Sequence, residues 1–263
     1  MRAQHAKKHS PWQTVLITGA SSGIGEALAY ALAVPNRQIA LVARRKERLE
    51  KVAQAIRDRG GEPLVLACDV GDPRAVQEAA SRLRQTLGTI DIAFLNAGIG
   101  SRGIAQNLTS AEAEQVMRVN YLGVVYWLDQ LLPDMQKHNR GTIVVTSSLA
   151  AYRALPGCGT YCAAKSAVSA LIESYQIDLL ATNVHLVLVT PYFVETEMTG
   201  FDPYRSRRVW MSAADAAQRI LQGVEAGKHH IAFPWHFRCF MTGLSLLPLP
   251  LYRMFWRLVR RGG

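Results

Sequence analysis

Cysteine is scarce in this chain of 263 residues, and its four cysteines show neither CxxC spacing nor a paired framework. We therefore expect reduced thiols and no metal site, because disulfide scaffolds and thiolate metal sites use recognisable cysteine spacings. No apolar stretch of signal-peptide length follows the basic N-terminus. This absence argues against secretion and predicts a cytoplasmic protein.

Acidic residues are missing from both ends of the chain. Residues 1–9 carry three basic side chains and residues 235–263 carry five arginines, out of a formal net charge of +10. The part between them is close to neutral and shows no basic stripe with interleaved aromatic residues, which a nucleic-acid-binding surface would have. We therefore expect no nucleic-acid partner.

No internal repeat or linker divides the chain, in which apolar, β-branched runs alternate with amphipathic stretches. Near-continuous apolar strands between helices are typical of a parallel sheet covered on both faces. We expect an α/β fold over residues 1–234, with a doubly wound parallel sheet of about seven strands and helices on both faces. The strands are expected at residues 15–18, 38–43, 63–68, 91–95, 142–146, 184–190 and 230–233, and the helices near residues 24–33, 45–59, 72–87, 110–138, 160–181 and 212–226.

A glycine-rich motif, Thr18–Gly25, directly follows the first apolar run and precedes an alanine-rich helix. Glycines let the backbone turn sharply and approach a pyrophosphate, and the helix N-terminus presents free N–H groups to the anion. This order of elements is typical of a dinucleotide-binding site. Cofactor contacts are expected from Gly19, Ser21, Ser22, Gly23, Ile24 and Gly25.

The ends of the next three strands carry further candidate cofactor residues. Arg44 and Arg45 follow the second strand, where a site for NAD usually has an acid; two guanidiniums fit the 2′-phosphate of NADP(H) better, although a solvated helix start is the alternative. Asp69 and Val70 follow the third strand, where Asp69 can accept a hydrogen bond from an adenine or simply begin a turn. Asn96, Ala97 and Gly98 follow the fourth strand as a small, close-packing turn.

Tyr161 and Lys165 are spaced i, i+4, and Ser148 lies thirteen residues before the tyrosine. In a helix this spacing puts the phenol and the ammonium on one face. A nearby positive charge is expected to lower the pKa of the phenol, which makes Tyr161 a candidate acid/base for a carbonyl or an alcohol. Ser147 competes with Ser148 for the role of a second donor, and the spacing favours Ser148.

These motifs, in this order and spacing, resemble the single-domain short-chain dehydrogenases/reductases over residues 14 to about 234. The resemblance implies catalysis by Tyr161 as general acid/base, with Lys165 binding the nicotinamide ribose and lowering the tyrosine pKa. It implies that Ser148 binds the reacting oxygen and that Asn120 holds a water in a proton relay. It also implies that Val194 and Thr196 contact the nicotinamide, and that the protein is a homodimer or homotetramer.

The chain departs from the family pattern at two positions. Leu95 stands where an asparagine is common, but this position is mostly structural in the family, so the expected activity is unaffected. Tyr192 stands where a glycine usually follows Pro191, so either its ring points into the substrate pocket or the loop takes another path. The expected pocket lining is mostly apolar, which favours a lipophilic carbonyl or alcohol. Its candidates are Ser148, Leu149, Tyr152, Leu155, Tyr192, Phe193, Met198 and Phe201.

The C-terminal segment, residues 235–263, extends beyond the usual end of the family. Residues 239–252 are uncharged but too few to span a bilayer, and Pro248 and Pro250 interrupt a helix. Residues 252–261 mix aromatic residues and arginines at helical spacing, which indicates an interfacial helix on anionic lipid at the inner face of a membrane. A C-terminal arm that packs on a neighbouring subunit is the alternative.

Two functions of different kinds are compatible with these observations. The first is an NADP(H)-dependent oxidoreductase that interconverts a hydroxyl and a carbonyl, with NAD(H) as the less favoured cofactor. The second is a cofactor-binding scaffold or redox sensor with little turnover. The complete set of Asn120, Ser148, Tyr161 and Lys165 favours the first.

Overall fold

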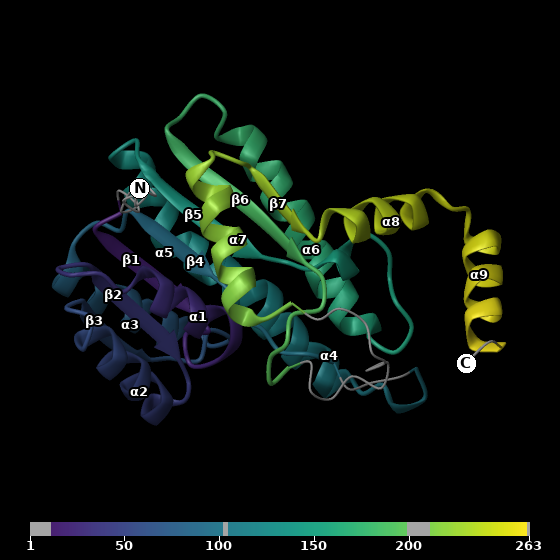
Figure 1. Cartoon of the computed structure of the whole chain (residues 1–263), viewed down its shortest axis with the longest axis horizontal. Coiled ribbons are helices and arrows are strands. Elements are labelled where there is room, and N and C mark those ends of the chain that lie inside the picture. The colour runs from purple at the N-terminus through teal and green to yellow at the C-terminus, as the bar shows by residue number, and fades with distance from the viewer. Residues whose placement is uncertain (1–11, 102–104, 199–210, 262–263) are drawn as a thin grey trace, which may run out of the picture.

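The computed structural model describes residues 12–101, 105–198 and 211–261, whose strands form one seven-stranded parallel sheet (Figure 1). The strand order is β3-β2-β1-β4-β5-β6-β7, and every neighbouring pair is parallel. The predicted doubly wound sheet is confirmed, and each predicted strand boundary lies within one residue of the observed one. The strands are β1 (Thr14–Thr18), β2 (Gln38–Ala43), β3 (Glu62–Ala67), β4 (Ile92–Leu95), β5 (Gly141–Thr146), β6 (Val184–Pro191) and β7 (His230–Phe233).

Helices cover both faces of the sheet because successive side chains of a strand point to opposite faces. On β1, Val15 and Ile17 pack in one apolar core, whereas Leu16 packs in the other. The first core is closed by α1, α2 and α7, and the second by α3, α5 and α6. The helices of the sheet domain are α1 (Gly23–Leu32), α2 (Lys46–Arg57), α3 (Pro73–Leu87), α4 (Ser110–Met117), α5 (Gly123–Lys137), α6 (Gly159–Asp178) and α7 (Ala213–Glu225).

The starts of three helices have polar caps. Asp72 accepts a hydrogen bond from the N–H of Arg74 at the start of α3. Thr109 and Ser212 cap α4 and α7 in the same way. Each cap satisfies a backbone N–H that has no partner inside its helix, which is why these sequences begin helices there.

The predicted helical stretch at residues 110–138 is helical from Ser110 to Lys137, but it is not α-helical throughout. A π-helical turn, Arg118–Leu122, separates α4 from α5. Such turns are frequent at functional sites, and this one carries Asn120, whose side chain is completely buried. The hydrogen bonds that hold Asn120 join distant parts of the chain, so the periodicity of the sequence did not reveal the turn.

Two further helices, α8 (Trp235–Leu246) and α9 (Leu249–Arg261), follow β7. The predicted interruption is present, because α8 ends before Pro248 and Pro250 falls in the first turn of α9, where proline is tolerated. Met241, Leu244 and Tyr252 form a third apolar core with residues near the end of β5. Among the described residues, no helix is long and apolar enough to cross a membrane.

The place for a ligand follows from the topology. The chain leaves β1 for β2 and β3 on one side, then returns to β4 on the other side of β1. At such a switch point a crevice opens outside the carboxyl ends of the strands. The loops that follow β1, β2, β4, β5 and β6, which carry the sequence motifs, all lie at this edge.

Candidate active site

Tyr161 and Lys165 lie one turn apart in α6, and Ser148 follows β5 at the start of a short 3₁₀ turn. The Tyr161 hydroxyl is hydrogen-bonded to the Ser148 side chain. Lys165 is buried, with its Nζ 5.8 Å from the centre of the Tyr161 ring and 2.8 Å from the carbonyl oxygen of Thr146, to which it donates. The fold therefore brings the three predicted residues together.

The pKa of Tyr161 differs from the sequence-based expectation. Burial is the largest influence and raises the pKa of this phenol to about 12. The hydrogen bond to Ser148 lowers the pKa, whereas the thiols of Cys158 and Cys162 raise it further. Burial also lowers the pKa of Lys165 to about 8. The expected lowering of the tyrosine pKa is wrong for this structure, because desolvation of the phenol is the largest influence and raises the pKa.

Ser147 and Ser148 have different surroundings, which separates the two candidates. Ser147 is 1% exposed, and its hydroxyl donates to the carbonyl of Lys165 and contacts the hydroxyl of Ser169. Ser148 is half-buried and bonded to Tyr161. Ser147 therefore joins β5 to α6, and Ser148 is the serine that faces the tyrosine.

Asn120 links the π-helical turn to the loop after β4. Its Oδ1 accepts from the N–H of Ile99 at 2.7 Å, and its Nδ2 donates to the carbonyl of the same residue at 2.8 Å. A Cβ added to Gly98 would lie 3.2 Å from this Oδ1 and 3.6 Å from the Nζ of Lys165. Asn120 thus holds the backbone of this loop close to the lysine.

The glycine-rich loop is built so tightly that two of its glycines accept no side chain. Gly19 has a φ of +69°, and a Cβ there would lie 2.9 Å from the Cα of Ala97. A Cβ on Gly25 would lie 2.3 Å from the carbonyl oxygen of Gly19. Thr18 accepts hydrogen bonds from the N–H groups of Asn96 and Ala97, which fixes the loop after β4 against the glycine-rich loop.

The start of α1 fits the phosphates of a dinucleotide. Its N-cap, Ser22, makes no side-chain hydrogen bond to the helix, so the first N–H groups of a ten-residue helix are free of a side-chain cap. With the close glycine backbone beside them, these donors suit an anion. The side chain of Ile24 packs against the first core, and that of Val70 belongs to the second.

The two arginines after β2 are placed differently. Arg45 donates to the hydroxyls of Ser21 and Ser22 at 3.1 and 2.9 Å, so it reaches the glycine-rich loop. Arg44 is more than half exposed and lies 4.0 Å from the carboxylate of Asp69. Asp69 also accepts from the N–H of Gly71, as a turn residue does.

The loop after β6 lies over the glycine-rich loop. A Cβ on Gly23 would lie 2.9 Å from Cγ2 of Thr196, and Val194 is buried in a bridge to Met211. Glu197, which the sequence did not indicate, accepts from Arg45 at 2.8 Å. This ion pair ties the loop after β6 to the loop after β2, and no local pattern announces it because 152 residues separate the partners.

The expected pocket residues are gathered by α8 and α9. Leu149, Tyr152, Leu155 and Tyr192 belong to the third core, in which Leu149 is 1% exposed. The ring of Tyr192 stacks on Phe237 of α8, with centroids 3.8 Å apart and planes at 16°. Tyr192 therefore anchors α8. Leu149, which the sequence predicts to line the pocket, is instead buried in this core.

The three remaining expected pocket residues are placed differently. Phe193 meets the ring of Tyr192 edge-on at 4.8 Å, and Met198 is 41% exposed. Phe201 lies outside the described residues.

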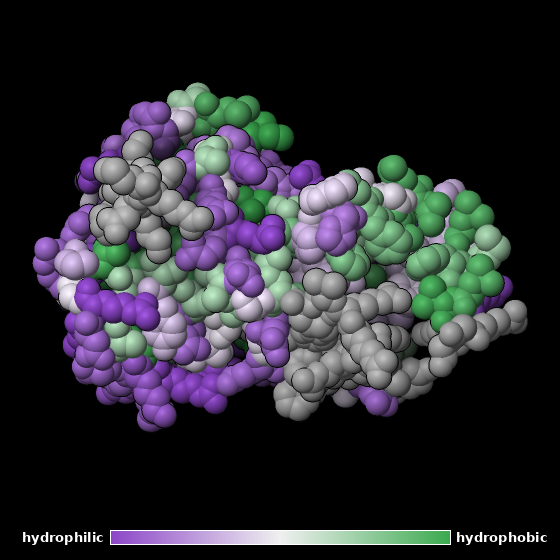
Figure 2. Space-filling view, viewed as in Figure 1, coloured by the Kyte–Doolittle hydropathy of each residue, from purple (hydrophilic) through white to green (hydrophobic). Residues whose placement is uncertain are grey.

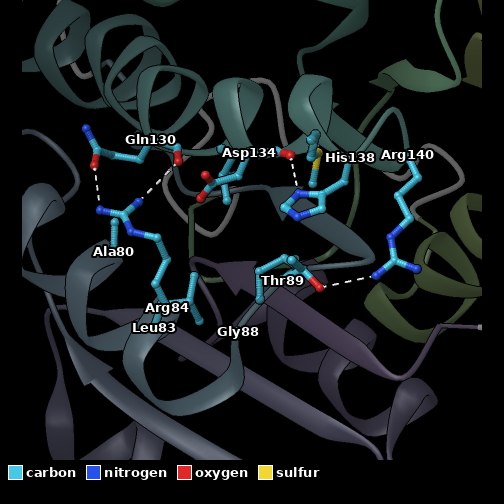
Figure 3. Close-up of a pocket in the computed structure, with 12 residues that line it drawn as sticks. Ala80, Leu83, Arg84, Gly88, Thr89, Gln130, Asp134, His138 and Arg140 are labelled. Atoms are coloured by element: carbon cyan, nitrogen blue, oxygen red, sulfur yellow. Dashed lines mark hydrogen bonds between the residues drawn. The ribbon is translucent and has the colours of Figure 1, made fainter.

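One hollow elsewhere is unconnected with these motifs. It lies between α3 and α5 (Figure 3). Several of its polar side chains bond one another or nearby backbone, as Arg84 does with Gln130 and Arg140 with Thr89. Among the described residues, no group of three histidine, cysteine or acidic side chains could hold a metal ion.

Comparisons with known proteins agree with this geometry. The family model for short chain dehydrogenase matches residues 13–204. The chain is 30% identical over 241 residues to an uncharacterized oxidoreductase of Myxococcus xanthus, covering 92% of this chain and 95% of that protein. It is 37% identical over 189 residues to 11-beta-hydroxysteroid dehydrogenase 1A of Arabidopsis thaliana, covering 71% of this chain and 54% of that protein.

Solved structures extend the likeness to the fold. A short-chain dehydrogenase of Sphingobium yanoikuyae in complex with NADPH superposes with a TM-score of 0.79 at 28% identity, over 85% of this chain and 88% of that one. One from Burkholderia phymatum in complex with NAD gives a TM-score of 0.81 at 25% identity, over 87% and 91%. With the matching family model and the assembled motifs, these likenesses establish that the chain belongs to the short-chain dehydrogenase family.

Proposed function

We propose that this protein is an NADP(H)-dependent oxidoreductase that interconverts a hydroxyl and a carbonyl on a lipophilic substrate. The observation that carries the proposal is the hydrogen-bonded pair of Ser148 and Tyr161, with buried Lys165 beside it, at the sheet edge that holds the glycine-rich loop. A nicotinamide bound there would supply or accept the hydride.

Tyr161 acts as the proton donor in the direction of carbonyl reduction. With a pKa of about 12, its phenol holds its proton at neutral pH and can give it to an oxygen that gains negative charge. Ser148 donates a second hydrogen bond to the same oxygen. Two donors aimed at one developing charge stabilise the transition state more than the ground state.

Lys165 and Asn120 support this pair. Lys165 is held by its bond to Thr146, and its charge lies on the ring side of Tyr161, where it favours phenolate once the proton has left. Asn120 keeps the loop after β4 near the lysine through Ile99. The proton relay through a water at Asn120 is part of the proposal.

The proposed cofactor contacts follow the loops at the carboxyl edge. The uncapped start of α1 would hold the pyrophosphate, and Val194 and Thr196 would contact the nicotinamide carboxamide. Arg44 and Arg45 favour NADP(H), because both guanidiniums follow β2 and no acid stands there to hold a ribose 2′-hydroxyl. Solved relatives bind either form, NADPH in one case and NAD in another.

The substrate preference rests on the walls of the site. Tyr192 and Phe193 follow β6 beside the third core, which is apolar and aromatic, and the side chain of Met198 lies next to Gly100 in the loop after β4. An apolar wall beside two hydrogen-bond donors suits a lipophilic ketone or alcohol. The similar dehydrogenase of Arabidopsis thaliana is named for a hydroxysteroid, which is compatible with this class.

Consumption of NADPH with a panel of lipophilic ketones tests the reaction. Tyr161→Phe should lower kcat at least about 100-fold, the range expected for loss of a general acid. Tyr175→Phe, on the same helix but among the residues of the second core, is the matched control and should keep its rate. A Tyr161→Phe variant with full activity, or a wild type that binds NADPH and reduces no carbonyl, favours the alternative of a scaffold or redox sensor with little turnover.

Cofactor choice is tested by binding. Arg44→Glu should weaken NADPH at least about tenfold while leaving NADH little changed, since a hydrogen bond to a charged group contributes about 1.5–3 kcal/mol. Arg57→Glu, at the other end of α2, is the control with the same charge change. Equal loss of both cofactors, or an unchanged NADPH affinity, contradicts the role of Arg44 at the 2′-phosphate.

The homodimer or homotetramer that the family resemblance implies is also part of this proposal. It is checked by light scattering on the purified full-length chain, over a range of concentrations. A monomer at all concentrations contradicts it.

A further inference from the structure

The exposed apolar residues of this protein are concentrated at one end. Twelve large apolar side chains are exposed in the described residues, and eight of them lie on α8 and α9. In Figure 2 the hydrophobic colour gathers at the end of the molecule that holds these helices in Figure 1, far from α2 and β3. The eight are Trp235, Phe240, Leu246, Leu249, Leu251, Met254, Leu258 and Val259.

The side chains of α9 separate into a face that packs on the protein and faces that do not. Tyr252 is buried, donates to the carbonyl of Ala154 and lies under the guanidinium of Arg153. Trp256, one turn later, packs against the same third core. Met254 and Leu258, also one turn apart, are 53% and 62% exposed. Because the face of α9 that carries Tyr252 and Trp256 packs on the protein, the exposed apolar residues of α9 belong to an ordered surface.

The charge of this segment is of one sign. Arg253 and Arg257 are exposed on α9, and the sequence has no acid from residue 235 to residue 263. Large apolar patches on a protein surface mark sites of association. A two-fold contact between copies would place the same patch, with the same arginines, against itself, whereas anionic lipid offers the opposite charge.

We propose that α8 and α9 form a membrane-docking surface for an anionic bilayer, on which the protein lies without crossing it. The absence of a bilayer-spanning helix among the described residues agrees with this arrangement. An apolar stripe beside arginines is the pattern of a helix that lies in the lipid interface.

This surface also adjoins the candidate active site. Phe237 of α8 stacks on Tyr192, which follows β6, and Met241 and Leu244 pack in one core with Leu149, next to Ser148. A bilayer under α8 and α9 would therefore lie close to the substrate end of the site. This consequence rests on the proposed function: a lipophilic substrate would reach Ser148 and Tyr161 from the lipid.

Co-sedimentation of the full-length protein with vesicles tests the docking surface. One set contains phosphatidylcholine alone and the other contains about one third phosphatidylserine. The protein should bind the anionic vesicles, and binding should weaken with added salt, because the attraction between exposed charges is screened. The double variant Met254→Asp/Leu258→Asp should bind at least about tenfold more weakly, because it replaces two apolar side chains that would be buried in the bilayer with charged ones. The charge variant Arg253→Glu/Arg257→Glu should lose most of its preference for the anionic lipid.

Matched controls keep the test independent of folding and catalysis. Leu180→Asp removes a side chain that is 76% exposed at the end of α6, and Arg74→Glu/Arg82→Glu makes the same charge change on α3. Both should bind vesicles like the wild type, and all variants should keep the wild-type circular dichroism.

Three results would overturn the docking proposal. They are no binding by the wild type, equal binding by the α9 variants and the wild type, and a dimer that the α9 apolar variant abolishes without any binding of vesicles. Because vesicle binding is measured without substrate or cofactor, a failure here is distinct from a failure of the proposed reaction.

Discussion

Replacing Lys165 with methionine should stabilise the fold, and the gain should be larger at pH 6 than at pH 9. Lys165 is 3% exposed, and burial lowers its pKa from 10.5 to about 8. The pKa of Lys165 is lower in the folded state than in the unfolded state, so folding is not penalised above the unfolded pKa. The penalty grows as the pH falls between the two pKa values and is complete below the folded pKa. The wild type is therefore penalised at neutral and acidic pH by a buried ammonium, which methionine does not carry.

The magnitude follows from the two pKa values. The lowered pKa corresponds to a penalty of about 3 kcal/mol well below pH 8, and linkage reduces this penalty to about 2 kcal/mol at pH 9. Methionine also loses the hydrogen bond to the carbonyl of Thr146, which costs about 1 kcal/mol at either pH. The stability advantage of Lys165→Met should thus shrink by about 1 kcal/mol between pH 6 and pH 9. Tyr161, with a pKa of about 12, does not titrate in this window.

Urea unfolding of both proteins at the two pH values measures this difference. Lys51→Met, at an exposed position on α2, is the control and should show the same difference from the wild type at both pH values. Catalytic activity should be lost in Lys165→Met at either pH, which separates stability from function. A stability difference that does not change between pH 6 and pH 9, or that grows with pH, refutes the reasoning that burial of a charged amine governs this site.

Three further predictions concern the site and its supports. Because the pKa of Tyr161 is raised to about 12, ketone reduction should not lose its proton donor between about pH 6 and 10, whereas the rate of alcohol oxidation should rise with pH through this range. Profiles of kcat against pH in the two directions check this, and an oxidation rate that is independent of pH contradicts it. Gly25→Ala should weaken NADPH at least about tenfold, since the new Cβ would lie 2.3 Å from a carbonyl oxygen of the phosphate loop, while Gly243→Ala, with open space around it, should be neutral in the same titration. Tyr192→Ala and Phe237→Ala should each destabilise the fold, and a double-mutant cycle should give a coupling of about 0.5–1.5 kcal/mol for the stacked rings; a coupling near zero would show that Tyr192 does not hold α8.

The fold and most of the site could be predicted from local pattern. Strands and helices follow from the spacing of apolar residues, and the caps at Asp72, Thr109 and Ser212 follow from residue type. The glycine-rich loop and the pair of Tyr161 and Lys165 are readable because each depends on residues close in sequence. Parallel topology then brings the strand ends to one edge, which explains why motifs far apart in the chain meet there.

Other features depend on contacts between distant residues, and only the tertiary structure decided them. Burial reverses the expected direction of the Tyr161 pKa, because the sequence shows the neighbouring charge but not the loss of solvent. The ion pair of Glu197 and Arg45, and the stacking of Tyr192 on Phe237, join segments with no shared pattern. The sequence by itself determined the elements, their order and the reacting groups, because these depend on residue type and short-range spacing. The tertiary structure decided solvent access, the supports of each group and the exposed face of α9, because these depend on which surfaces the folded chain covers.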